Sequence, residues 1–149
     1  MFVGGGPEQP QIKAYADEIG VGDCCTFTGR VSDEDLCRIL SSADIAVDPD
    51  PKNDWSDKST MNKIMEYMMF GKPIVAFDLK ENRYSAGGSA AYAKPNDVGE
   101  FASLISQLLD NEGKRREMGA AAVRRVESEL SWDHSRPHLL AAYRKLFEC

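Results

Sequence analysis

Residues 59–68 combine polar side chains that could bind a ligand with an apolar face that could hold them in place. On a helical wheel the apolar side chains gather within about 100°: Met61, Ile64, Met65 and Met68. The polar side chains lie together on the opposing arc: Ser59, Asn62, Lys63 and Glu66. The apolar stripe is expected in the core. If the polar arc faces solvent, it is unremarkable, but in a cleft it would present a carboxylate, an ammonium and an amide to a ligand.

Three other clusters are weaker candidates. The run Gly4-Gly5-Gly6-Pro7 permits close approach of a ligand, although a tight turn without a ligand explains it equally well. His134 and His138 could share a helix face, but no third metal ligand lies nearby. The aspartates of residues 48–57 do not follow the spacing of a calcium-binding loop, so we expect a solvated acidic loop. The sequence therefore predicts no metal site and no cofactor.

The elements that would position these residues alternate between short apolar runs and longer helical patterns, which is typical of an α/β domain with a parallel sheet. The predicted strands are Phe2–Gly4, Cys25–Thr28, Ile45–Asp48, Pro73–Phe77 and Ala90–Ala93. The predicted helices are Glu8–Ile19, Asp33–Ser42, Thr60–Phe70, Glu81–Ser85, Val98–Leu109, Lys114–Leu130 and His134–Phe147. Ser32 with Asp35, and Asp97 with Glu100, are typical helix N-caps.

Ligands of parallel sheets bind outside the carboxyl ends of the strands. In this sequence those ends are Gly4–Pro7, Gly29–Val31, Asp48–Ser59 and Asp78–Arg83. The glycine run and the start of residues 59–68 are therefore expected at the same edge of the sheet.

Composition narrows the class of protein. The chain has 149 residues and a formal net charge of −6, without a dense basic run, so nucleic acid is not an expected partner. The four cysteines lack metal or disulfide spacing, which favours reduced thiols in the cytoplasm. No apolar run is long enough to span a membrane.

An ordered set of short motifs carries a family resemblance over nearly the whole chain. It consists of Val3–Glu8, Phe27–Val31, Ser42–Asp44, Glu66–Met68, Gly71–Ala76, Arg116–Gly119 and Ser131-Trp132. In this order and spacing the chain resembles the C-terminal, donor-binding domain of the retaining GT-B glycosyltransferases of family 4, the group 1 transferases. The resemblance implies one Rossmann-like domain over residues 1–149 with its first strand and helix missing at the N-terminus.

The resemblance also implies roles for individual residues at a nucleotide-sugar site. Glu66 matches the second acid of the family's Glu-(x)7-Glu motif, which hydrogen-bonds the nucleotide ribose. Arg30 and Val31 fall where the family holds the base, and Gly4 and Gly5 match the glycine loop that borders the cleft.

The start of the helix that contains Glu66 is the expected diphosphate site, because helix N-termini bind anions. The residues expected around the phosphates and the sugar are Lys58, Ser59, Thr60, Met61 and Asn62. Lys58 stands where the family usually has its first motif glutamate, which contacts the sugar, and the adjacent Asp57 could substitute.

The implied function is transfer of a sugar, with retention, from a UDP- or GDP-type donor to a glycan or lipid-linked acceptor, as in polysaccharide biosynthesis. The family's N-terminal acceptor domain and its phosphate-binding arginine and lysine lie upstream of the match, so we expect the isolated fragment to be inactive. Open sheet edges predict either direct closure between Phe2–Gly4 and Ile45–Asp48 or self-association. The full-length enzyme is expected in the cytoplasm or peripheral at a membrane. A GT-B nucleotide-sugar epimerase and a non-catalytic nucleotide-binding or assembly module remain alternatives.

Overall fold

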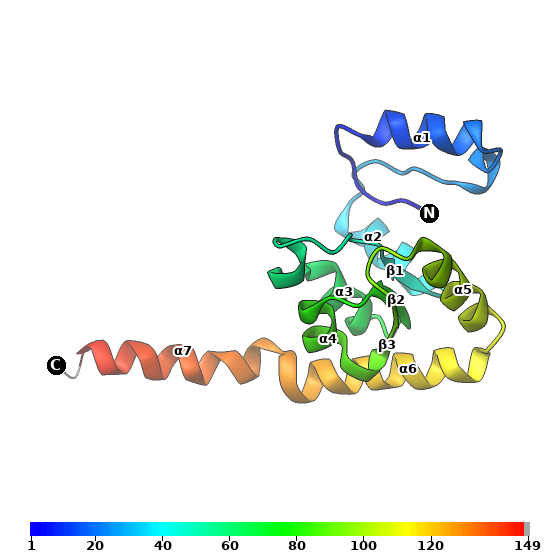
Figure 1. Cartoon of the computed structure of the whole chain (residues 1–149). Coiled ribbons are helices and arrows are strands. Elements are labelled where there is room, and N and C mark those ends of the chain that lie inside the picture. Colours follow the sequence, from blue (N-terminus) through cyan, green and yellow to red (C-terminus); the bar gives the residue numbers. More distant parts are fainter. Residues whose placement is uncertain (148–149) are drawn as a thin grey trace. The chain divides into compact units, whose positions relative to one another are not determined.

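The computed structural model describes residues 1–147 and consists of two compact units, the first ending at Ser42 and the second beginning at Ala43 (Figure 1). Each unit has its own backbone pairing, and each is described separately. The second unit contains the parallel sheet and most of the buried side chains.

The first unit is built around two extended segments and two helices. Helix α1 spans Gln9–Glu18 and α2 spans Asp33–Ser42. The predicted strands Phe2–Gly4 and Cys25–Thr28 form only isolated bridges, Phe2 with Phe27 and Gly4 with Gly29. They remain short because two segments that pair only with each other bury little surface. The stacked rings of Phe2 and Phe27, with centroids 4.7 Å apart, hold them together.

The second unit contains a parallel sheet of three strands in the order β1-β2-β3: Ala46–Asp48, Ile74–Phe77 and Ala90–Ala93. Ala46 pairs with Ile74, and Ile74 pairs with Ala90, so the three strands start at the same level. The α/β class and these three strands confirm the sequence prediction. All four residues of β2 are buried, as expected for a central strand covered on both faces.

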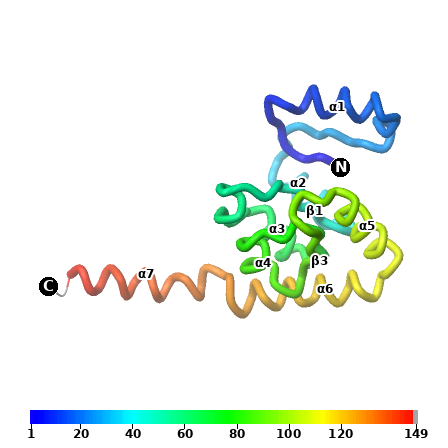
Figure 2. Tube along the Cα trace, viewed as in Figure 1, coloured from blue at the N-terminus to red at the C-terminus, as the bar shows by residue number. Residues whose placement is uncertain are grey.

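The helices of the second unit follow the sequence prediction closely. They are α3, α4, α5, α6 and α7: Asn62–Met69, Lys80–Ala86, Val98–Leu109, Glu112–Arg125 and Trp132–Phe147. A π-helical turn, Val126–Leu130, lies between α6 and α7, where one continuous helix was expected up to Leu130, and the trace continues through it (Figure 2). The predicted cap at Asp97 is confirmed, because its carboxylate accepts the N–H of Glu100 at 2.9 Å.

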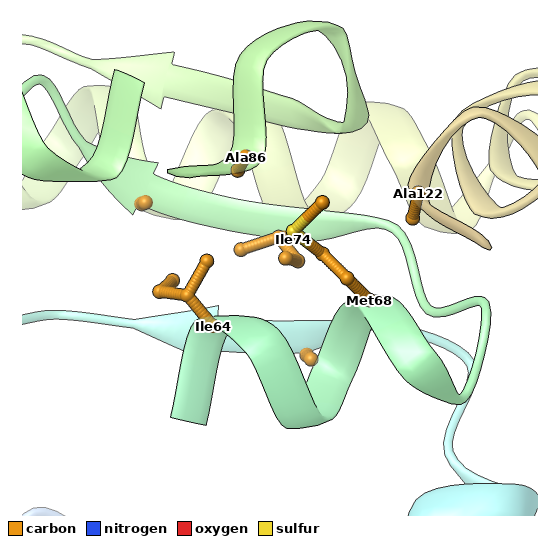
Figure 3. Close-up of a cluster of buried hydrophobic side chains, with 7 residues drawn as sticks. Ile64, Met68, Ile74, Ala86 and Ala122 are labelled. Atoms are coloured by element: carbon orange, nitrogen blue, oxygen red, sulfur yellow. The ribbon is translucent and has the colours of Figure 1, made fainter. Parts of the chain in front are cut away.

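Two buried clusters lie on the two faces of this sheet. Side chains alternate along β2, so Ile74 and Ala76 belong to one cluster and Val75 and Phe77 to the other. The first cluster is completed by helices α3, α4 and α6 through Ile64, Met68, Ala86 and Ala122 (Figure 3). The second includes residues of α5 and α6: Phe101, Leu108 and Met118. The apolar stripe predicted for residues 61–68 is therefore the face that packs on the sheet.

Each unit pairs its own extended segments. Within the second unit the described sheet consists of β1, β2 and β3. Within the first unit Phe2 and Gly4 bond with the backbone of residues 26–29. Direct closure of Phe2–Gly4 onto β1 and pairing of β1 with another copy of the chain both stay predictions.

Candidate functional site

The loops that follow β1 and β2 meet at the carboxyl edge of the sheet. The backbone N–H of Lys80, at the start of α4, donates to Asp57 Oδ1 at 3.0 Å. The hydroxyl of Thr60 donates to Glu81 Oε2 at 2.7 Å. Two side-chain contacts thus fasten residues 57–60 to the start of α4, and they give this edge a defined shape.

A partly buried ion cluster joins the first of these loops to α3. Lys63 Nζ is 2.8 Å from Asp48 Oδ1 and 2.7 Å from Asp50 Oδ2. Asp48 is 0% exposed, and its second oxygen accepts the amide of Asn82 at 2.8 Å. Asp48 Oδ1 has no other partner in the described chain, so Lys63 is the group that compensates the negative charge on this oxygen. The cluster joins the end of β1 to α3 and α4.

Burial and pairing act in opposite directions on these groups. Burial raises the pKa of Asp48, and the hydrogen bond and charge of Lys63 only partly offset this. Burial works to lower the pKa of Lys63, but its bonds to Asp48 and Asp50 outweigh burial and the pKa is raised. Lys63 therefore stays charged at neutral pH.

This cluster corrects two expectations from the sequence. The acidic loop is not simply solvated, because Asp48 is buried and Asp50 is paired with Lys63. The ammonium of Lys63 is not presented to a ligand together with Glu66, since two carboxylates bind it. A helical wheel shows which residues share a face of one helix, but it contains no information on what lies opposite that face.

Glu66 remains as an exposed carboxylate on α3. Within residues 1–147 its side chain makes no hydrogen bond or ion pair. Asn62, the first residue of α3, is also exposed. Glu66 can therefore accept hydrogen bonds from a ligand without breaking a contact of the fold.

The residues before α3 divide between those held by the fold and those left open. Ser59 Oγ donates to the carbonyl of Trp55 at 2.7 Å, and Thr60 is bound to Glu81. Met61 is half-buried and packs against the first core cluster. As N-cap residue, Met61 provides no side-chain bond to the first N–H groups of α3, and of these the N–H of Ile64 donates to the Met61 carbonyl at 3.0 Å.

Lys58 and Asp57 have different environments although they are adjacent. Lys58 is exposed at the end of the 3-10 turn Ser56–Lys58. Asp57 is 13% exposed, and the pKa of its carboxyl is lowered first by the bond from Lys80 N–H and then by Lys52 and Lys80. Asp57 thus fastens the loop to α4 through Oδ1, and its substitution for the family's first motif glutamate stays a prediction.

In the first unit, the glycine run borders a cavity of about 390 Å³. Its lining residues are Phe2–Gln9, Ile12 and Phe27. Gly4 has φ 110, a conformation that side chains rarely adopt. Arg30 is exposed and Val31 is half-buried directly after Gly29, whose φ is 66. The four predicted residues of this unit, Gly4, Gly5, Arg30 and Val31, therefore lie on loops at the ends of its extended segments.

A second ion pair, between Asp78 and Arg83, lies after β2 and was not predicted from the sequence. Arg83 binds both oxygens of Asp78, at 2.5 and 2.8 Å, and its guanidinium lies 4.4 Å from the ring centre of Tyr92. Arg83 lowers the pKa of Asp78. Burial raises the pKa of Tyr92 to about 12. The spacing of an acid and an arginine around a helix start was a usable signal, but the role of Tyr92 required the fold.

Two further properties concern metals and membranes. Within the part of the chain that the structure describes, no three His, Cys, Asp or Glu side chains form a group suited to a metal ion. His134 Nε2 lies 2.9 Å from the carbonyl of Glu127. None of the helices in residues 1–147 combines the length and the apolar character needed to cross a bilayer.

Comparison with known proteins identifies the family. The family model described as "Glycosyl transferases group 1" matches residues 1–111. The chain belongs to the group 1 glycosyl transferases. The resemblance carried by the ordered motifs is thereby confirmed.

Individual group 1 relatives extend this result. An MMP α-(1→4)-mannosyltransferase of Mycolicibacterium hassiacum is 31% identical over 142 residues, which cover 93% of this chain and 33% of that protein. A D-inositol 3-phosphate glycosyltransferase of Mycolicibacterium smegmatis is 30% identical over 155 residues, covering 96% of this chain and 33% of that protein. The chain spans about a third of the length of these relatives.

A solved structure supports the fold of this group 1 chain. Sucrose-phosphate synthase from Thermosynechococcus elongatus aligns with a TM-score of 0.81 and 23% identity, over 98% of this chain and 38% of that one. The expected Rossmann-like architecture of a GT-B half is confirmed by this likeness.

Proposed function

We propose that the chain binds the nucleotide-sugar donor of a glycosyltransferase that transfers the sugar, with retention, to a glycan or lipid-linked acceptor. Glu66 carries this proposal, because it is an unpaired, exposed carboxylate in the second turn of α3, while Asp48, Asp50 and Asp57 of the preceding loop are bound to other groups. A carboxylate can accept from both vicinal hydroxyls of a ribose. The start of α3 has no side-chain cap, which supports diphosphate binding by the N–H groups of Asn62 and Lys63.

The donor is a UDP- or GDP-type nucleotide sugar in this proposal, and it binds without a metal ion. In the first unit, the family resemblance alone assigns Arg30 and Val31 to the base and Gly4 and Gly5 to the glycine loop. Lys58, with Ser59, Thr60, Met61 and Asn62, contributes to the sugar and phosphate side. The acceptor is held by a further domain, so this chain alone binds the donor without transferring its sugar. Calorimetry with and without EDTA tests the metal-free binding.

We expect Glu66→Ala to weaken nucleoside diphosphate binding by about 10- to 100-fold, since hydrogen bonds to a charged acceptor are lost. Isothermal titration with UDP, GDP and ADP measures the effect. Glu127→Gln is a matched control, because Glu127 is an exposed acid of the second unit whose carboxylate has no partner within residues 1–147. Equal affinities for the Glu66→Ala variant and the unmodified chain would contradict the ribose assignment.

A non-catalytic nucleotide-binding module is a second candidate function, and Lys58 favours it. An ammonium at the position of the motif glutamate removes a carboxylate acceptor for sugar hydroxyls. Transfer of labelled sugar by a protein that contains both domains separates the two functions. Binding without transfer would support the module.

A further inference from the structure

Trp55 is an exposed aromatic residue on the loop between β1 and α3. Its side chain is 71% exposed, although burial of an indole would normally stabilise the fold. A single exposed apolar residue needs no explanation by itself. Two features suggest that Trp55 binds a ligand: the fixed backbone that carries it and the polar groups beside it.

The backbone around Trp55 is fixed by hydrogen bonds. Asn53 Oδ1 accepts the N–H groups of both Trp55 and Ser56, each at 2.9 Å. Ser59 Oγ donates to the Trp55 carbonyl, and the hydroxyl of the buried Ser56 donates to the carbonyl of Pro51. The indole is thus displayed from a preformed turn. Little backbone conformational entropy would be lost when a ligand stacks on it.

The polar groups on either side of Trp55 suit a hydroxylated ligand. Asp54 and Lys58 are both exposed, and neither side chain has a partner among the described residues. One can accept and the other can donate a hydrogen bond.

We propose that Trp55 is a stacking platform for a pyranose ring. Such a ring offers an apolar C–H face to the indole, and its rim of hydroxyls can reach Asp54 and Lys58. The inference rests on the proposed function, which places a sugar at this edge, where Asp57 and Thr60 fasten the Trp55 loop to α4. The ring belongs either to the donor sugar or to an acceptor glycan.

Fluorescence of the intact chain tests this directly, because Trp55 and Trp132 are its only two tryptophans. Trp132→Phe leaves Trp55 as the single reporter. We expect GDP-mannose or UDP-glucose to change its emission more than GDP or UDP does. If a response is seen with mannobiose or maltose and not with the nucleotide sugars, the platform serves the acceptor.

Affinity provides the second readout. In calorimetry, Trp55→Ala should weaken binding of the responding sugar ligand by about tenfold and leave nucleoside diphosphate binding within about twofold. Trp55→Phe should recover most of the affinity, since a ring is retained. Tyr84→Ala is a matched control, because Tyr84 is an aromatic residue on α4 that is 68% exposed.

Three outcomes would overturn the inference. Full response to GDP or UDP alone would assign the platform to the base. Trp55→Ala could bind nucleotide sugars with normal affinity while Trp55 emission in the Trp132→Phe chain does not respond to any sugar ligand. That result would remove Trp55 from the site while the proposed function stands. Absence of binding by every nucleotide and sugar would remove the proposed function as well.

Discussion

Gly119→Ala should lower the free energy of unfolding by about 3 kcal/mol, because overpacking a buried backbone contact forces the two elements apart. A Cβ on Gly119 would lie 2.1 Å from the carbonyl oxygen of Gly71 and 3.1 Å from its carbonyl carbon. Both are backbone atoms, so rotation of a side chain cannot relieve the clash. Gly71 cannot readily move, since it directly follows the C-cap of α3 with φ 62.

The expected loss concerns packing and not helix propensity. Met118 and Ala122, on either side of Gly119 in α6, belong to the two core clusters, so a shift of α6 disturbs both. Gly113→Ala is the matched control in the same helix, because its Cβ would meet only Asn111 Oδ1 at 3.6 Å. That control should keep or slightly raise stability, by up to about 1 kcal/mol. Urea denaturation followed by circular dichroism compares the three chains, and equal midpoints would contradict the close contact.

The contact between Gly71 and Gly119 shows where sequence reasoning ends. Gly71 is recognisable as a helix stop from its neighbours Phe70 and Pro73. Nothing local indicates that a second glycine, far along the chain, packs on its carbonyl. Short-range patterns determine element types, whereas close approaches between helices depend on the assembled core.

In the candidate site, too, local elements were predictable from the sequence and contacts between elements were not. The strand Ile74–Phe77 was predictable because a short apolar run between a helix stop and an acid is typical of a buried strand. Glu66 was identified by its family motif, and the structure leaves it exposed. The bonds of Asp57 to α4 and of Lys63 to Asp48 were not predictable, since each joins different elements whose relative placement follows only from the fold. In the first unit, strand predictions failed because too little surface was available to extend the bridges.

Lys63→Met should reduce the free energy of unfolding at neutral pH by about 2 kcal/mol. Removing one member of a buried pair typically costs about 3–5 kcal/mol. We expect less here because the Lys63 side chain is 33% exposed, so water can partly replace it. The penalty arises because Asp48 keeps its charge in a buried position, with Asn82 as its remaining hydrogen-bond partner on the side chain.

The loss of unfolding free energy in Lys63→Met should depend on pH, and the direction of this dependence follows from the pKa of Asp48. The pKa of Asp48 in the folded chain lies above its usual value of 3.8, and Lys63 is the group that opposes this rise. In Lys63→Met the pKa rises further. A raised carboxyl pKa contributes stability that is present below the unfolded value and is lost as pH rises through the folded one. The deficit of Lys63→Met relative to the unmodified chain should therefore be largest near pH 7 and shrink as pH falls towards 3.8.

Two further chains distinguish this charge effect from a general loss of packing. Adding Asp48→Asn to Lys63→Met removes the uncompensated charge, so the double variant should be more stable at pH 7 than Lys63→Met alone and should lose the pH dependence of the deficit. Lys80→Met is the surface control, because Lys80 is 76% exposed and its Nζ lies 3.9 Å from Asp57, so we expect less than about 1 kcal/mol. Urea midpoints at pH 7 and pH 4.5 measure all four chains. An equal deficit of Lys63→Met at both pH values would show that Lys63 acts through the contacts of its aliphatic chain, and Asp48 would then not be the group it compensates.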